Sequence, residues 1–124
     1  MATVREVMKA GLYSVTASTT VGEAISLMAQ NKIGSALVME GGKLIGIFTE
    51  RDTVRAISQS HDAPDHEISS WMTRDPKTVS PDVDVDTALR TMLDNGFRHL
   101  PVVEGGEVIG MVSMRDLAEL TAGA

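Results

Sequence analysis

The sequence has no cysteine among its 124 residues, which excludes disulfide frameworks, thiolate zinc sites and thiol nucleophiles. Aromatic residues make up only 3%, and 11 basic residues stand against 17 acidic ones, for a formal net charge of −6. Such a chain does not suit a nucleic acid polymer, which needs a basic face that displaces counterions. A small phosphate-bearing ligand stays compatible with this charge, because one or two local cations suffice to bind it.

Long apolar runs are also missing. No run approaches the roughly 18 residues of a membrane span. The N-terminal stretch carries Glu6 and has no long apolar core, unlike a secretory signal. We therefore expect a cytoplasmic protein with no membrane partner. What the chain does contain is 11 glycines, 8 methionines and 43% hydrophobic residues. This composition is ordinary for a globular protein and indicates an adaptable, methionine-rich core.

The chain contains an internal repeat. A shift of 64 residues aligns Met8–Asp52 with Met72–Asp116 without a gap. The best-matched stretch reads GGKLIGIFTERD from Gly41 and GGEVIGMVSMRD from Gly105. This period is too long for a solenoid unit. It predicts two copies of one small module, with the following division: 1–58 for the first copy, 59–66 for a polar linker and 67–124 for the second copy.

Each copy has the same predicted order of elements, β-α-β-β-α after a short helical lead-in. Thr20 and Glu23 have the spacing of a capping box at the start of the first long helix, and Asp84 caps its counterpart. The two Gly-Gly pairs permit the positive φ values of tight hairpins. We expect lead-ins over 4–9 and 68–72, first strands near 14–16 and 78–80, long helices ending near Asn31 and Asn95, hairpins over 36–48 and 100–112, and closing helices over 50–58 and 114–120.

The predicted fold class is mixed α/β. A unit of about 50 residues would be marginal alone. Its hairpin strands are apolar without clean alternation, as expected when both faces of a sheet are buried. Its own helices can cover only one of these faces. We therefore predict that two β-α-β-β-α repeats pack sheet to sheet about a pseudo-two-fold axis.

Each copy ends its last strand with Gly-x-x-Thr/Ser-x-x-Asp. Thr49 and Asp52 lie at the start of a helix in the first copy, and Ser113 and Asp116 are their counterparts. An Asp in this position can accept two hydrogen bonds from a vicinal diol such as ribose. A hydroxyl residue beside free backbone N–H groups can face a phosphate, and Gly46 would let a flat ring approach the strand. The same spacing also fits a box that only caps the helix. The two roles are compatible, because a helix can cap itself when empty and serve a ligand when full.

These features together resemble the cystathionine-β-synthase (CBS) domain, and the tandem resembles a Bateman module. The resemblance covers nearly the whole chain and rests on the lead-ins Val7-Met8 and Trp71-Met72, the run from Arg98 to Val103 and both helix-start motifs. It implies a β-sheet core with two clefts between the repeats, where adenosine-containing ligands often bind. In this family the Asp holds the ribose hydroxyls and the Ser/Thr lies near ribose or phosphate. Those roles map onto Asp52 with Thr49 and onto Asp116 with Ser113.

The resemblance also implies ligand-binding positions at the start of each second strand and opposite each first strand. These positions are Ile33, Gly34, Ser35 and Tyr13 in the first copy, and Phe97, Arg98, His99 and Lys77 in the second. Basic residues at this place contact phosphates in nucleotide-binding relatives. Because Arg98 and His99 align with Gly34 and Ser35, we expect two unequal sites and one nucleotide per chain, in either cleft.

Several of these side chains also have a purely structural interpretation. Arg98 could pair with Glu40 or Glu104, and His99 could be a satisfied core imidazole. We expect the remaining candidates to be structural as well: Arg51 and Arg115 solvated on helix starts, His61 and His66 solvated in an acidic linker rather than bound to a metal, and Trp71 in the core.

The function favoured by the resemblance is a regulatory, energy-sensing module that binds AMP, ADP or ATP and signals by conformational change to an unknown effector protein. It would need no cofactor and no metal. The alternatives are an interaction or structural CBS pair with vestigial clefts, and a sensor of NAD or S-adenosylmethionine. Catalysis is not expected, because no nucleophile is assembled with a base and an orienting group. By analogy with the family we expect a homodimer, with weak support from extra apolar helix residues: Leu27, Leu93, Leu117 and Leu120.

Overall fold

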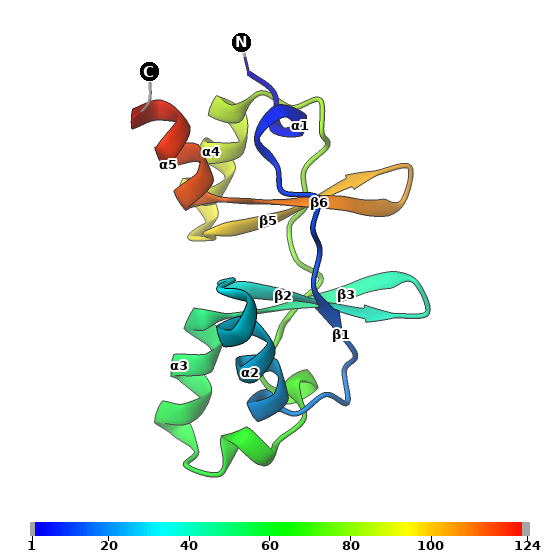
Figure 1. Ribbon diagram of the computed structural model, residues 1–124, viewed down its shortest axis with the longest axis vertical. Helices are drawn as coiled ribbons and strands as arrows, with labels where there is room; N and C mark the ends of the chain where they lie inside the picture. Colours follow the sequence, from blue (N-terminus) through cyan, green and yellow to red (C-terminus); the bar gives the residue numbers. More distant parts are fainter. Residues whose placement is uncertain (1, 123–124) are drawn as a thin grey trace. The chain divides into compact units, whose positions relative to one another are not determined.

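A computed structural model describes residues 2–122 and confirms the mixed α/β class (Figure 1). Its elements in chain order are α1 (Val4–Val7), β1 (Ser14–Val15), α2 (Val21–Asn31), β2 (Ser35–Glu40), β3 (Lys43–Thr49), α3 (Glu50–Gln59), the 3₁₀ turns η1 (Ala63–Asp65) and η2 (Ile68–Ser70), β4 (Thr73–Arg74), α4 (Val85–Asn95), β5 (His99–Glu104), β6 (Glu107–Ser113) and α5 (Met114–Ala122). No helix within the described residues is long and apolar enough to cross a membrane.

The chain divides into two compact units whose limits differ from those of the sequence repeats. One unit, here called the central unit, runs from Tyr13 to Pro76. The other, here called the terminal unit, joins the residues up to Leu12 with those from Lys77 onward. Each lead-in therefore packs with the strands and helices of the opposite repeat: α1 belongs to the terminal unit, and η2 belongs to the central unit.

Backbone hydrogen bonds hold each lead-in in its unit. In the terminal unit, the Val4 N–H donates to Val83 O at 2.8 Å, and Lys9 exchanges two bonds with Met111, both 2.9 Å. Figure 1 shows this N-terminal segment, in blue, passing along β6. In the central unit, the Ile68 N–H donates to Thr19 O at 2.8 Å. The lead-ins thus act as parts of the sheets and loops against which they lie.

The central unit contains a four-stranded sheet in the order β1-β2-β3-β4. β1 runs parallel to β2, and the other neighbours are antiparallel. The β2–β3 hairpin turns at Gly41 and Gly42, whose φ values of 55° and 77° are both positive, as a two-residue type I′ turn requires. The hairpin predicted from the Gly-Gly pair is therefore confirmed.

The terminal unit has the matching β5–β6 hairpin, but the strand predicted near 78–80 is wrong. Only an isolated parallel bridge joins Val79 to Val102. In the central unit the Leu37 N–H donates to Tyr13 O at 3.0 Å. Pro101 occupies the position of Leu37 in the repeat and has no N–H to donate. The ladder in the terminal unit is therefore one bond shorter, and no strand forms there.

Both long helices begin where their capping residues predict. Thr20 Oγ1 accepts from the Glu23 N–H at 3.1 Å, and Glu23 Oε1 accepts from the Thr20 N–H at 3.0 Å. Asp84 Oδ1 accepts from the Thr87 N–H at 2.7 Å. The ends also match, because α2 and α4 stop at left-handed residues, Lys32 with φ 54° and Gly96 with φ 71°.

Each unit has its own apolar core, formed by its hairpin and its long helix. The lead-in of the opposite repeat adds at least one residue to each core. The buried sets are Val21, Ala24, Met28, Ala36, Val38, Phe48, Ile68 and Met72 in the central unit, and Val4, Ala88, Met92, Leu100, Val102, Val112 and Leu117 in the terminal unit. One prediction changes as a result: Leu117 is only 2% exposed and does not support an intermolecular surface. The segment 59–66, predicted as a polar linker, contains η1, and its Ala63 is fully buried.

Candidate functional site

The acid of the first motif lies at the junction of β3 and α3 and closes a capping box. Asp52 Oδ2 accepts from the Thr49 N–H at 2.9 Å and from the Thr49 hydroxyl at 3.1 Å. The Asp52 N–H donates back to Thr49 Oγ1 at 3.3 Å. These bonds satisfy backbone donors at the helix start. The capping interpretation of the motif is therefore realised in the structure.

The second oxygen of the same carboxylate faces a cation. Asp52 Oδ1 lies 3.4 Å from Arg55 Nη2, one turn further along α3. The Asp52 side chain is only 8% exposed. A carboxylate so far removed from water needs charged or hydrogen-bonding partners, and Thr49 and Arg55 are those partners.

The acid of the second motif has the same cap but a different cation. The Ser113 N–H donates to Asp116 Oδ2 at 3.2 Å, and the Asp116 N–H donates to Ser113 Oγ at 3.1 Å. Asp116 Oδ1 lies 3.3 Å from Lys9 Nζ, which comes from the N-terminal segment. The side chain of Asp116 is 12% exposed, and that of Lys9 is 74% exposed.

In both motifs, one carboxylate oxygen belongs to the helix cap, and the other forms a long ion pair with a cation among the described residues. A carboxylate oxygen has two lone pairs and can accept a further hydrogen bond. Each acid can therefore serve its helix and still accept from a ligand hydroxyl. The two roles that the motif predicts are chemically compatible in this geometry.

The structure brings the other candidate residues of the first copy to the same end of the β2–β3 hairpin. Ser35 pairs with Thr49 across the strands, and Gly34 O accepts from the Glu50 N–H at 3.1 Å. Tyr13 O accepts from the Leu37 N–H at the start of β2. All members of this central set lie in one unit: Tyr13, Ile33, Gly34, Ser35, Thr49 and Asp52.

The candidate residues of the second copy gather in the same way in the terminal unit. His99 pairs with Ser113 across β5 and β6, and Arg98 O accepts from the Met114 N–H at 2.8 Å. Lys77 is exposed and lies just before the bridge at Val79. The terminal set comprises Lys77, Phe97, Arg98, His99, Ser113 and Asp116.

The structural interpretations of the candidate cations can be compared with the contacts. Glu104 pairs with Arg5 at 2.5 Å rather than with Arg98. Within the described part of the terminal unit, no ion pair involves Arg98, which is exposed. Arg115 pairs with Glu119 at 3.4 Å on the surface of α5. Arg98 and Lys77 are therefore the cations of the terminal set that form no salt bridge within the described residues.

The close approach that Gly46 permits is made by the protein itself. A Cβ at Gly46 would lie 2.7 Å from Met72 Sδ and 2.9 Å from Thr73 O. At Gly110 it would lie 2.6 Å from Met8 Sδ. The expectation of a flat ligand ring over Gly46 is therefore wrong for the side toward which a Cβ would point, because the lead-in methionine fills that space.

Two residues of this geometry were missed by sequence reasoning, Arg55 and Lys9. Arg55 had a signal, because it follows Asp52 by three residues and lies on the same face of the helix. Lys9 had none, because it is far from Asp116 in the sequence and only the packing of the N-terminal segment brings them together.

His66 of the predicted linker contacts neighbouring side chains. His66 Nδ1 accepts from Trp71 Nε1 at 3.2 Å, and His66 Nε2 lies 3.3 Å from Asp62 Oδ1. Trp71 is half-buried against the central core. Within the described residues, no group of three or more His, Cys, Asp or Glu side chains is placed to hold a metal ion.

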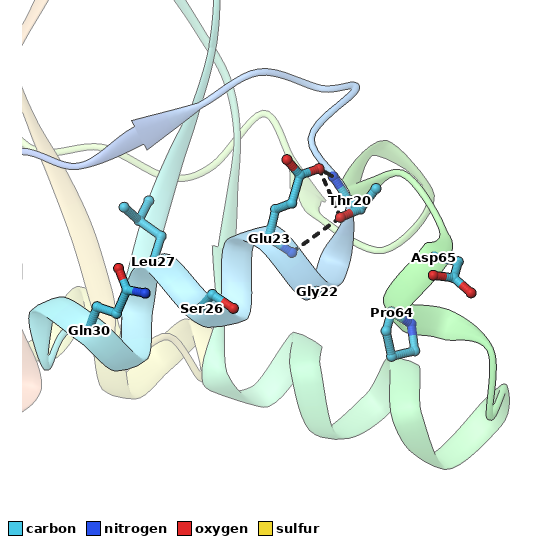
Figure 2. Close-up of a pocket in the computed structure, with 8 residues that line it drawn as sticks. All are labelled: Thr20, Gly22, Glu23, Ser26, Leu27, Gln30, Pro64 and Asp65. Carbon is cyan, nitrogen blue, oxygen red and sulfur yellow. Dashed lines mark hydrogen bonds between the residues drawn. The ribbon is translucent and has the colours of Figure 1, made fainter.

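A shallow hollow of the central unit shares no residue with the central set. Figure 2 shows it between α2 and η1, with the capping bonds of Thr20 and Glu23 drawn as dashed lines. It is lined by Thr20, Gly22, Glu23, Ser26, Leu27, Gln30, Pro64 and Asp65. Its capping groups are already bonded within the chain, and none of its residues belongs to the central set.

Known proteins with similar sequences share this repeat. A 17.7 kDa protein from the bps2 3′ region of Acidianus ambivalens is 41% identical over 118 residues, which are 93% of this chain and 70% of the relative. The CBS domain-containing protein YhcV of Bacillus subtilis is 31% identical over 95% of this chain and 84% of its own length. Other relatives are longer: the chain spans 42% of MJ1225 from Methanocaldococcus jannaschii.

Solved structures agree with the fold. The CBS-domain containing protein ATU1752 from Agrobacterium tumefaciens superposes with a TM-score of 0.91 at 27% identity, covering 97% of this chain and 99% of that chain. The CBS domain pair of protein MJ0100, in complex with 5′-methylthioadenosine and S-adenosyl-L-methionine, has a TM-score of 0.91 at 25% identity and covers 99% and 98%. The CBS domain family itself matches residues 4–59 and 67–123. The chain therefore belongs to the CBS domain family and carries two CBS domains in tandem.

Proposed function

We propose that this CBS domain pair is a regulatory module that binds an adenosine-containing ligand, with AMP, ADP and ATP as the first candidates. The observation that carries the proposal is the burial of the two motif acids and the weak engagement of one oxygen of each. The side chains of Asp52 and Asp116 are 8% and 12% exposed, and among the described residues each Oδ1 oxygen has an ion-pair partner beyond 3.2 Å. A ribose diol donates hydrogen bonds that such an acceptor can take.

The choice of adenosine is supported by the relative MJ0100. Its CBS pair, 25% identical to this chain, is described in complex with 5′-methylthioadenosine and S-adenosyl-L-methionine, which have adenosine in common. The terminal set adds exposed Arg98 and Lys77, which suit a phosphate, whereas the central set contains no basic residue. We infer that phosphate-bearing ligands depend chiefly on the terminal set.

The signal to an effector would be a population shift. A ligand that binds one conformer more tightly than another enriches that conformer by its difference in affinity. The effector protein would then recognise the enriched conformer. This mechanism needs no bond-making step, in keeping with a regulatory rather than a catalytic role.

A homodimer is part of the proposal. Leu93 is 63% exposed on α4, and Val54, Ile57 and Leu120 are exposed on the closing helices. Apolar side chains in such positions are available to cover one another in a second copy. Light scattering coupled to gel filtration at micromolar concentration should give twice the mass of the chain, and a monomer would remove this part of the proposal.

The experiment that tests the ligand is a thermal-shift panel of AMP, ADP, ATP, NAD and S-adenosylmethionine, followed by calorimetry of any positive compound. A ligand at 100 times its dissociation constant should stabilise the folded state by about 2.7 kcal/mol, which is easily seen. Asp52→Ala and Asp116→Ala, tested separately, should lose affinity to different extents. If no compound raises the melting temperature, the interaction protein with vestigial clefts is the better description.

A further inference from the structure

Arg55 occupies a position between the acid of the central set and the single tryptophan of the chain. Its Nη2 atom lies 3.4 Å from Asp52 Oδ1 and 2.5 Å from the carbonyl oxygen of Trp71. Its guanidinium carbon lies 5.4 Å from the centroid of the Trp71 ring. One side chain of α3 therefore contacts a candidate ligand-binding group and the end of the segment that leads into the second repeat.

The contacts continue from Trp71 through this segment, residues 60–71, here called the connecting segment. The Trp71 and His66 rings stack at 6.2 Å with an interplanar angle of 7°, and Trp71 Nε1 donates to His66 Nδ1 at 3.2 Å. His66 Nε2 lies 3.3 Å from Asp62, whose carboxylate accepts from the Ser60 hydroxyl. An unbroken series of polar and ring contacts thus runs from Asp52 to Ser60, all within the central unit.

The chemistry of arginine explains why this arrangement holds the acid in place. A guanidinium is planar, stays charged and presents several donors in a fixed fork. Here the Trp71 carbonyl and ring fix the fork, so the donor that faces Asp52 Oδ1 is held still although the Arg55 side chain is 44% exposed. A nearly buried carboxylate beside a fixed cation keeps its Oδ1 oxygen pointed in one direction.

We propose that Arg55 is the positioning residue of the central ligand site and that it couples the state of Asp52 to the connecting segment. Arg55 acts through Asp52 and does not itself bind the ligand. A hydroxyl that bonds to Asp52 Oδ1 shares this oxygen with Arg55, and any adjustment of Arg55 changes its contact with Trp71. The ligand part of this inference rests on the proposed function, whereas the coupling between Asp52 and Trp71 does not.

The coupling is tested first without ligand, because Trp71 is the only tryptophan and reports on its surroundings by its emission and by its indole N–H resonance. We expect Asp52→Asn and Arg55→Met each to shift both signals. The double variant should show no further shift, because the two changes interrupt one path. Arg90→Met, an exposed arginine of α4 in the terminal unit, is the matched control and should leave Trp71 unchanged.

The outcome that overturns the coupling is equally clear. If Asp52→Asn leaves the Trp71 emission and indole resonance as they are in the wild-type protein, Asp52 is not coupled to the connecting segment. Additive shifts in the double variant would lead to the same conclusion. Arg55→Lys is a second variant that keeps the charge without the fork. Arg55→Lys should restore part of the ion pair with Asp52 and still shift the Trp71 signals. A folding defect of Arg55→Met therefore cannot be mistaken for coupling.

The positioning role is tested by calorimetry with S-adenosylmethionine as the probe, because this compound carries no phosphate and the central set contains no basic residue. Arg55→Met should raise the dissociation constant by about tenfold, within the usual range for coupled sites, and Arg90→Met should not change it. An unchanged constant in Arg55→Met would overturn the positioning role. If the wild-type protein binds none of the compounds of the panel, the proposed function fails. The ligand-free measurements still decide whether Asp52 and Trp71 are coupled.

Discussion

Asp52 and Asp116 are equivalent in the repeat, yet their cations are not. Arg55 reaches Asp52 from the same helix and is itself fixed by Trp71. Lys9 reaches Asp116 from the N-terminal segment and is 74% exposed. The shift of 64 residues places Arg55 on Glu119 and Lys9 on Thr73, so neither cation has a basic counterpart. The same motif is therefore held by a local, fixed partner in one copy and by a distant, solvated partner in the other.

The two cores differ in a complementary way. In the central unit Ala36 pairs with Phe48 across the hairpin, and in the terminal unit Leu100 pairs with Val112. All four side chains are fully buried. In the central pair the smaller residue, Ala36, lies on the first strand of the hairpin. In the terminal pair the smaller residue, Val112, lies on the second strand. Because cores are close-packed, each pair works as a unit, and neither member is free to vary alone.

The largest expected effect comes from exchanging this core pair. Phe48→Val should lower the free energy of unfolding by about 2–3 kcal/mol, because it leaves a cavity. Ala36→Leu should lower it by about 2 kcal/mol, because it overpacks the same space. The double variant, which reproduces the Leu–Val pair of the terminal unit, should lie within about 1.5 kcal/mol of the wild-type protein. Urea unfolding measures all three, and additive losses would mean that the two hairpins are not interchangeable in this respect.

Local signals explain why most of the elements could be predicted from the sequence. The capping box at Thr20 and Glu23 and the paired glycines at Gly41 and Gly42 specify backbone conformations by themselves. The lost strand near Val79 also had a signal, Pro101. This signal could be interpreted only from the structure, which shows that the N–H of the equivalent residue, Leu37, forms a hydrogen bond with the first strand of the central unit.

The rest depended on long-range packing. Nothing in the periodicity of the first lead-in states that it packs in the terminal unit, since an apolar face predicts burial and not the partner. The pair of Lys9 with Asp116 follows from that packing. The filling of the space over Gly46 by Met72 likewise depends on which unit receives the second lead-in. The two motif acids and Arg55 thus have local signals in the sequence, whereas Lys9 and Met72 reach their places only through long-range packing.

A second, smaller effect concerns the glycines beneath the lead-ins. An added methyl at Gly46 meets the Thr73 carbonyl at 2.9 Å, which the β3–β4 ladder holds in place. At Gly110 the nearest backbone atom, Lys9 O, is 3.2 Å away, and the closer Met8 side chain can move. Gly46→Ala should therefore cost about 2 kcal/mol and Gly110→Ala about 1 kcal/mol, within the usual range for overpacking. Equal losses in urea unfolding would show that the two lead-ins are held with equal rigidity.

The two acid–cation pairs should differ in their response to salt. Lys9→Met should cost about 0.5 kcal/mol at low salt, as for an exposed ion pair, and this difference should vanish near about 1 M salt, where charges are screened over a few ångströms. The effect of Arg55→Met should persist, because the contacts of Arg55 with the Trp71 carbonyl and ring are lost as well. Thermal unfolding at two salt concentrations measures both, and a persistent Lys9 effect would mean that Lys9 is as firmly held as Arg55.

The smallest expected effect is a difference in how the caps of α2 and α4 make the stability of the protein depend on pH. The Thr87 N–H holds the pKa of Asp84 below its ordinary value, and the Thr20 N–H does the same for Glu23. A carboxyl with a lowered folded-state pKa adds stability that is complete above its unfolded pKa and is lost as the pH falls through the folded value. Asp84→Asn keeps the cap without the charge, so its melting temperature should fall less than that of the wild-type protein between about pH 5 and pH 3. Glu23→Gln should reduce this acid-induced fall in melting temperature less than Asp84→Asn does, because the Thr20 hydroxyl still caps α2 at any pH. If the two variants reduce the fall in melting temperature equally, the Thr20 hydroxyl adds nothing to the cap of α2, and both helix starts depend on their carboxylates alone.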